Sequence, residues 1–127
     1  IEINTDTPKS SFENLFFRSS VYISSDIEKG RRGVPVSANL LRAMEQGCAL
    51  VASDTHGRKE LVVEGVNGFL YPPNDSEKLF QNLNVLLNSE ETITRFQMNN
   101  INICKTKYDG KSTINKFIYY YDTIINK

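Results

Sequence analysis

The sequence lacks the features that mark nucleic-acid-binding, membrane-spanning and disulfide-stabilised proteins. Its 15 basic and 15 acidic side chains give a net charge of zero, which provides no basic surface for nucleic acid. The sequence contains no apolar run near the roughly 20 residues of a membrane-spanning helix. It begins at Ile1 without a charged and then apolar leader, so we expect no secretory signal and a segment of a longer protein.

Cysteine and histidine are scarce, with two cysteines and one histidine among the 127 residues. Cys48 and Cys104 have no neighbours at the spacing of metal ligands, so we expect neither a metal site nor a disulfide framework. Cys48 precedes an apolar run and is predicted to be buried as a small hydrophobic residue. Two separate thiols suit a reducing compartment, which predicts a cytoplasmic location. His56 is predicted to be an ordinary loop residue, with a ligand contact as the alternative.

Length and composition predict one soluble domain. The chain is 39% hydrophobic and 24% charged, which are ordinary values for a globular domain. A chain of 127 residues is long enough for one hydrophobic core, but it is too short for a two-domain enzyme. We therefore treat residues 1–127 as a single domain.

Compact apolar runs alternate with helical patterns along the chain. The β-branched, aromatic and continuous apolar runs predict strands at residues 1–3, 21–23, 49–52 and 69–71. Apolar residues at helical spacing predict five helices, in the ranges 10–16, 36–44, 75–87, 89–103 and 114–125. This alternation predicts an α/β fold with a parallel sheet and helices on both faces.

Polar residues and glycines mark the ends of these predicted elements. Ser10 begins a capping-box pattern, and Asp75 and Ser89 are suitable N-caps for their helices. Gly47 has the position expected just after the last turn of a helix. Asn67-Gly68 predicts a turn before the strand at residues 69–71.

Two predicted loops, at residues 25–35 and 53–59, leave the carboxyl ends of strands. In open parallel sheets ligands bind beyond these ends, so we expect both loops to border one crevice. The segment from Gly33 to Ser37 leads into a helix, where unpaired backbone amides and the helix dipole favour an anion such as phosphate. The alternative is a plain Gly-Pro loop without a ligand.

Six segments form a set whose order and spacing are more specific than any one of them. They are FENLFF (12–17), VYISS (21–25), LLRAM (40–44), GCALVAS (47–53), T-x-G-x-x-E-L-V (55–62) and GVNGFL (65–70). The set resembles the nucleotide-sugar half of GT-B glycosyltransferases, especially the large retaining family 4 type. The resemblance implies a Rossmann-like parallel sheet flanked by helices, corresponding to the latter part of a GT-B C-terminal domain.

The resemblance also implies a set of donor-binding residues. In the family, a first glutamate meets the hydroxyls of the donor sugar and a second meets the ribose, because a carboxylate accepts two strong hydrogen bonds. Glu28 has the first position by its offset from Ser25, and Arg32 takes that position when the match is made from the helix side. Arg42 has the second position. The implied donor-binding residues are Glu28, Arg32, Gly33, Ser37, Leu41, Arg42 and Glu45.

Arg42 leaves several alternatives open. A guanidinium group cannot accept a hydrogen bond, so it cannot replace a ribose-binding carboxylate. Either Arg42 contacts a phosphate, or Glu45 takes over the ribose one turn later, or donor binding is lost. Glu28 and Arg42 as solvent-facing charges are a further alternative.

The function implied by the resemblance is the donor-binding portion of a retaining glycosyltransferase of the hexosyltransferase type. It would transfer a sugar from a nucleotide-sugar to a saccharide or lipid acceptor, in bacterial surface polysaccharide or glycolipid synthesis. No metal or other cofactor is expected. The N-terminal acceptor domain of the family is missing from this sequence, so we expect the isolated chain to be inactive. Peripheral association of the whole enzyme with the inner face of the membrane is a further expectation.

The alternative function comes from a different class. A non-catalytic Rossmann-like interaction or regulatory module would keep the scaffold and lose donor binding. Arg42 favours this alternative, whereas Glu28, the glycine-bearing loop and the segment from Thr55 to Gly68 favour the enzyme.

Overall fold

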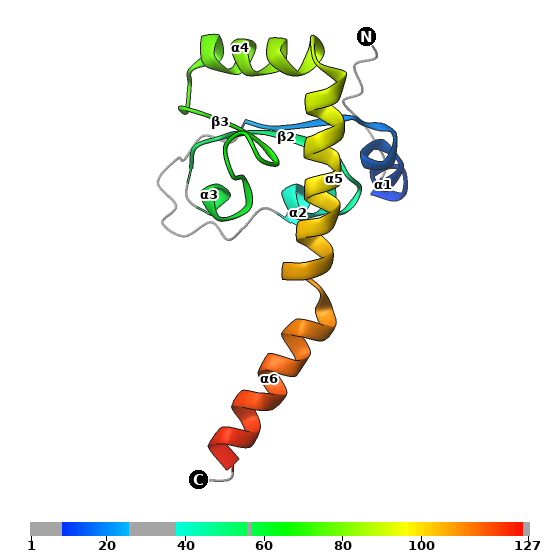
Figure 1. Cartoon of the computed structure of the whole chain (residues 1–127), viewed down its shortest axis with the longest axis vertical. Coiled ribbons are helices and arrows are strands. Elements are labelled where there is room, and N and C mark those ends of the chain that lie inside the picture. The colour runs from blue at the N-terminus through cyan, green and yellow to red at the C-terminus, as the bar shows by residue number, and fades with distance from the viewer. Residues whose placement is uncertain (1–8, 26–37, 56, 126–127) are drawn as a thin grey trace.

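The computed structural model describes residues 9–25, 38–55 and 57–125 of the chain (Figure 1). Along these residues the elements follow in the order α1 (Lys9–Arg18), β1 (Val21–Ser24), α2 (Ala38–Glu45), β2 (Ala49–Ser53), α3 (Arg58–Leu61), β3 (Gly68–Tyr71), α4 (Ser76–Leu87), α5 (Glu90–Lys107) and α6 (Gly110–Ile125). The predicted strand at residues 1–3 lies outside the described residues.

The strands form a parallel sheet in the order β1-β2-β3, which confirms the predicted α/β architecture. Val21 of β1 pairs with Ala49 of β2, and Ser53 of β2 pairs with Tyr71 of β3. Every residue of the central strand β2 is buried, as expected for a continuous apolar run that is covered on both faces. Because the strands are parallel, their carboxyl ends share one edge of the sheet.

Helices cover both faces of this sheet, as predicted (Figure 1). On one face, Leu40 of α2 lies in a core cluster with Leu50 of β2. On the other face, Leu86 of α4 and Phe96 of α5 lie in a cluster with Val51 of β2. Figure 1 shows α5 running from the α4 layer past the sheet to the α2 layer, so this helix joins the two clusters.

The predicted helix ends are confirmed by their backbone geometry. Gly47 follows α2 with a φ of 76°, a left-handed conformation that glycine adopts without steric strain. Its N–H donates to the Met44 carbonyl at 3.0 Å, and the Cys48 N–H donates to the Ala43 carbonyl at 2.9 Å. These two bonds form a Schellman motif, which satisfies carbonyls at the end of the helix.

The predicted N-caps of α4 and α5 are also present. The Asp75 carboxylate accepts from the Lys78 N–H at 2.8 Å, and the Ser89 hydroxyl accepts from the Thr92 N–H at 3.2 Å. The first predicted helix is confirmed, but α1 begins at Lys9, so Ser10 lies inside the helix and the capping box predicted there is wrong.

The turn before β3 lies earlier than predicted. Residues 65–67 form the turn, with Gly65 at a φ of 73°, whereas Gly68 already pairs with Leu50 of β2. The spacing of Leu79, Leu83, Leu86 and Leu87 predicts one buried stripe for α4, but Leu87 is 78% exposed. The buried side of α4 is centred on Leu86, and the next residue of an α-helix points about 100° away.

Two buried asparagines connect α5 with the segment between α3 and β3. The side-chain amide of Asn67 donates to the Leu61 carbonyl at 2.8 Å and to Oδ1 of Asn100 at 2.9 Å. The Val63 N–H donates to Oδ1 of Asn67 at 2.7 Å. This network satisfies backbone groups of a segment that has no regular secondary structure, so it stabilises the path of the chain into β3.

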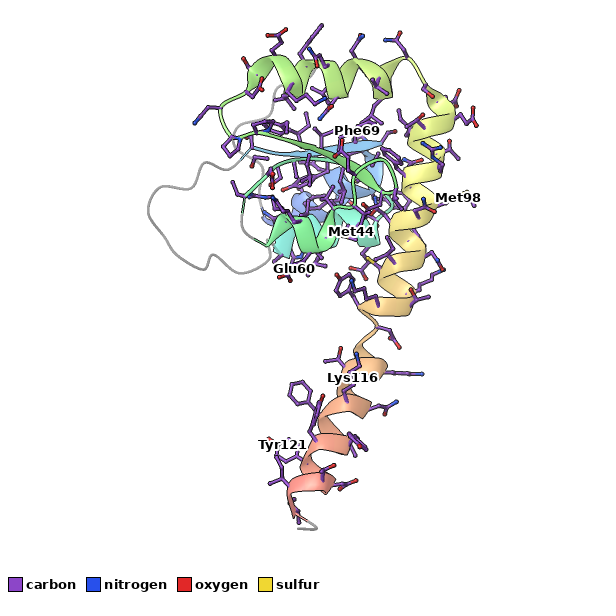
Figure 2. All side chains as sticks on the ribbon, turned by 60° about the vertical axis from the view of Figure 1, so that its left-hand side comes forward. Met44, Glu60, Phe69, Met98, Lys116 and Tyr121 are labelled. Atoms are coloured by element: carbon purple, nitrogen blue, oxygen red, sulfur yellow. The ribbon has the colours of Figure 1, made fainter. Side chains whose placement is uncertain are left out.

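The last helix, α6, is confirmed, but its apolar stripe is not part of the core. Figure 1 shows α6 extending away from the sheet and its covering helices, and Figure 2 shows Lys116 and Tyr121 on this extension. The helical spacing predicts an apolar stripe that consists of Ile114, Phe117, Ile118, Tyr121 and Ile125. All described side chains of α6 are exposed, including those of this stripe.

Cys48 is buried, as predicted, and its protection can be tested by thiol labelling. Its thiol group donates to the Phe16 carbonyl at 3.4 Å and to the Ser19 carbonyl at 3.3 Å. Burial raises the pKa of the Cys48 thiol, which lowers the fraction of reactive thiolate at neutral pH. In a Cys104→Ala variant we expect Cys48 to react with a maleimide about 100-fold more slowly than a free thiol, because reaction requires local opening.

The matched variant is Cys48→Ala, which retains only the half-buried Cys104. Cys104 is expected to react faster than Cys48 at every pH. Equal labelling rates for the two variants in the folded state would contradict the burial of Cys48.

Candidate functional site

At the carboxyl edge of the sheet, the last residue of each described strand has a polar side chain. Ser24, Ser53 and Tyr71 are the last residues of β1, β2 and β3, and all three are buried. Ser53 and Tyr71 are register partners, and the Tyr71 hydroxyl donates to the Ser24 carbonyl at 3.5 Å. The edge at which parallel sheets bind ligands is therefore lined by groups that form hydrogen bonds.

Arg58 contacts the ends of β1 and β2 at this edge, and it was not predicted as a site residue. Its side chain is only 7% exposed. Its Nε atom donates to the Ser24 hydroxyl at 3.2 Å, and Nη1 donates to the Ser53 hydroxyl at 3.2 Å and also to the Thr55 hydroxyl. A charged residue in a predicted loop is expected to be exposed to solvent, so the sequence pattern did not indicate that Arg58 is buried against the strand ends. The only signal was its place in the T-x-G-x-x-E segment.

Asp54 adds a carboxylate at the same edge. Its N–H donates to the Tyr71 carbonyl at 2.7 Å, and its Oδ2 atom pairs with Nζ of Lys59 at 3.2 Å. Its Oδ1 atom is buried and has no hydrogen-bond partner within the part of the chain that the structure describes. The edge therefore combines an arginine, hydroxyl groups and a carboxylate.

Three of the predicted donor-binding residues line a groove between α2 and α5. Leu41, Arg42 and Glu45 of α2 face the end of α5 and the start of α6 across a volume of about 430 Å³. The rest of the lining is formed by Ile101, Cys104, Lys105, Tyr108, Asp109 and Gly110. Burial, and then the Glu45 carboxylate, raise the pKa of the Cys104 thiol, so this thiol is protonated at neutral pH.

Leu41, Arg42 and Glu45 lie at increasing distances from the start of α2. The helix leaves the carboxyl side of β1 and returns the chain to the amino end of β2. At 1.5 Å per residue, Glu45 lies about 10 Å along the axis from Ala38. Arg42 is about one turn nearer than Glu45 to the start of the helix, where the phosphates of a ligand were predicted.

The remaining predicted residues, Glu28, Arg32, Gly33 and Ser37, lie outside the described residues, and so does His56. The described chain reaches Ser25 on one side of this segment and Ala38 on the other, and both residues are exposed. The structure therefore places the ends of the predicted donor loop but not its side chains.

The described residues do not gather a set of metal ligands. No group of three or more histidine, cysteine, aspartate or glutamate side chains that suits a metal ion occurs in residues 9–25, 38–55 and 57–125. Likewise, none of the described helices combines the length and the apolar character that a membrane span requires.

Comparison with known proteins agrees with this architecture. Residues 13–102 match the family model described as Glycosyl transferases group 1. An uncharacterized glycosyltransferase from Methanocaldococcus jannaschii is 28% identical over 108 residues, which cover 85% of this chain and 26% of the relative. The chain thus spans about a quarter of the length of the curated relative that it matches.

Similar solved structures include HepE from Anabaena and LpcC from Francisella tularensis. HepE in complex with UDP superimposes with a TM-score of 0.74 at 26% identity, over 91% of this chain and 30% of that chain. HepE in complex with UDP-glucose gives a TM-score of 0.71 at 26% identity, over 86% and 29%. The C-terminal domain of LpcC, a group 1 glycosyl transferase, has the same fold, with a TM-score of 0.72 at 19% identity over 85% and 53%. The family match covers most of the chain and the fold is that of a GT-B C-terminal domain, so this chain belongs to the group 1 glycosyltransferases.

Proposed function

We propose that this chain forms the donor-binding part of a retaining glycosyltransferase that transfers a hexose from a nucleotide-sugar to a saccharide or lipid acceptor. The observation that carries the proposal is the polar carboxyl edge of the parallel sheet, in a chain of the group 1 family. HepE, which is 26% identical, was solved with UDP and with UDP-glucose, and this supports a UDP-sugar as the donor class. The proposed setting is cytoplasmic synthesis of surface polysaccharide or glycolipid.

In the proposed complex, the diphosphate lies at residues 33–41, where the chain enters α2. Backbone amides at the start of a helix are unpaired and carry partial positive charge, so they favour phosphate oxygens. The proposal assigns charge neutralisation to this helix start and to arginine side chains, in place of a metal ion. Arg42 lies one turn into α2, and its guanidinium group is suited to phosphate because it presents several donors in one plane.

The proposed partner within the whole enzyme is an acceptor-binding domain. The exposed apolar stripe of α6 supports this partner, because contiguous apolar surface of this kind marks an interaction site in soluble proteins. Figure 2 shows that Tyr121 lies far from the sheet, so the stripe is available to a neighbouring domain. Because acceptor and donor must be held together for transfer, we expect no sugar transfer by the 127-residue chain alone.

The proposal predicts that UDP binds to the 127-residue chain. We expect a dissociation constant of roughly 1 mM, equivalent to about 4 kcal/mol. Titration of isotopically labelled protein should shift the backbone amide resonances of residues 38–41 and 53–58. The resonances of α6 beyond Tyr119 serve as an internal control, because Figure 1 shows this helix extending away from the sheet.

Two variants then separate the open roles of Arg42 and Glu45. Because Arg42 lies nearer to the start of α2, we expect Arg42→Ala to weaken UDP binding by about threefold and Glu45→Ala by less. The opposite order would assign the ribose to Glu45. Titration with GDP under the same conditions compares the dissociation constants of a uracil and a guanine nucleotide.

A second candidate function is a non-catalytic interaction module, and Arg42 is the observation that favours it. The resemblance assigns it the position of the ribose-binding glutamate, and it is exposed on α2. If UDP and GDP at high millimolar concentration shift no resonances at the carboxyl edge, the donor-binding proposal fails and the interaction module becomes the better function.

A further inference from the structure

Arg58 joins two strand ends at the edge where the donor is proposed to bind. Its guanidinium group donates to the hydroxyl of Ser24 at 3.2 Å and to the hydroxyl of Ser53 at 3.2 Å. It also donates to the hydroxyl of Thr55. These acceptors belong to the end of β1, the end of β2 and the loop that follows β2. One side chain therefore spans three segments that border the same edge.

The arginine is itself fixed at both ends. Its N–H donates to the Thr55 carbonyl at 3.2 Å, and its carbonyl accepts from the Val62 N–H at 2.7 Å. A buried side chain held at its backbone and at its head group has lost most of its rotamer freedom. The planar guanidinium group also fixes the directions of its donors, which a lysine ammonium group does not. Arg58 therefore forms a rigid connection between the strand ends.

The end of β1 is the point that relates this connection to a ligand. Ser24 ends β1 and Ser53 ends β2, and open parallel sheets bind ligands beyond the carboxyl ends of their strands. A displacement of Ser24 relative to Ser53 would change the geometry of this edge. Binding groups must be placed within about 0.5 Å to be effective, so a small displacement is sufficient to weaken binding.

We propose that Arg58 is a positioning residue for the donor: by holding Ser24 and Ser53 together, it sets the geometry of the carboxyl edge at which a nucleoside diphosphate-sugar is proposed to bind. The inference rests on the proposed function, because it concerns the same edge of the sheet. It adds a residue that acts through its neighbours and lies outside the implied donor-binding set.

The test compares UDP binding by the 127-residue chain and three variants, followed by backbone amide shifts. Arg58→Met keeps the apolar stem and removes all the donors, and we expect about tenfold weaker binding. Arg58→Lys restores one donor group and is expected to recover part of this loss, to about threefold. Ser24→Ala keeps the positive charge and removes one acceptor, and we expect about threefold weaker binding.

A core variant on the other face of the sheet serves as the matched control. Phe96→Leu removes packing in the cluster with Val51 and changes none of the groups that bond to Arg58, so UDP binding should stay within about twofold of wild type. If Arg58 had only a structural role, the Arg58 variants and Phe96→Leu would both lower stability, and they would not differ in their affinity for UDP. If Arg58→Met does not fold, Arg58→Lys and Ser24→Ala decide the matter.

The outcomes separate the inference from the proposed function. Wild-type binding with no loss in the Arg58 and Ser24 variants overturns the inference and leaves the proposed function intact. Equal losses in Phe96→Leu and the Arg58 variants also overturn it, because the effect would then be one of general stability. If the wild-type chain binds no UDP, both fail together.

Discussion

Asn100→Leu is expected to lower the free energy of unfolding by about 3 kcal/mol. Asn100 is fully buried on α5, and its side chain joins three segments. Nδ2 donates to the Cys48 carbonyl at 2.7 Å and to the Asn67 carbonyl at 2.9 Å, and Oδ1 accepts from Nδ2 of Asn67 at 2.9 Å. Leucine has a similar volume but leaves these buried groups without their partner, at about 1 kcal/mol or more for each.

Urea denaturation, followed by far-ultraviolet circular dichroism, measures this change. The matched control is Asn102→Leu, which makes the same substitution on the same helix at an exposed position. Its effect should stay within about 0.5 kcal/mol. A loss below about 1 kcal/mol for Asn100→Leu would show that water satisfies these groups and that the asparagine network contributes little.

Elements held by local interactions were predictable from the sequence. Gly47 and the caps Asp75 and Ser89 act within a few residues of their own positions, so short patterns were sufficient to locate them. The strand at residues 49–53 was predictable because burial on both faces produces a continuous apolar run. In each case the physical cause is contained in a window of a few residues.

The asparagine network was not predictable, because its causes lie far apart in the chain. Asn100 bonds to partners 33 and 52 residues away, and a polar residue in a helical pattern predicts a solvent-facing position. The same limit applies to α6. Its apolar stripe predicted a helix correctly, but periodicity identifies a face without identifying what covers it.

The candidate site shows the same division between local and tertiary information. The exposed positions of Arg42 and Glu45 follow from the helical period, since Leu40, Ala43 and Met44 occupy the buried side of α2. The burial of Arg58 was not predicted because its hydrogen-bond partners come from other segments. Ser24, for example, is 34 residues away in the sequence. Whether a charged residue is buried depends on hydroxyl groups that only the folded sheet brings to it.

Gly68 provides the second large expected effect, through a close approach between two strands. A Cβ atom at this position would lie 2.5 Å from the Leu50 carbonyl oxygen and 2.8 Å from the Leu50 Cβ. Both atoms belong to the central strand β2, which is packed on both faces and cannot move aside cheaply. Gly68→Ala is therefore expected to lower the free energy of unfolding by about 3 kcal/mol.

Substitutions at two other glycines distinguish this steric contact from the effect of backbone conformation. At Gly65 a Cβ would meet nothing within 4 Å, but its φ is 73°, so Gly65→Ala should lose only about 1 kcal/mol, through left-handed strain. At Gly110, the first residue of α6, a Cβ also meets nothing within 4 Å, and Gly110→Ala should be neutral or slightly stabilising. The expected order of destabilisation in urea is Gly68→Ala, then Gly65→Ala, then Gly110→Ala. If Gly65→Ala were the most damaging of the three, conformation would outweigh the contact with Leu50, and the close pairing of β2 and β3 at this position would be wrong.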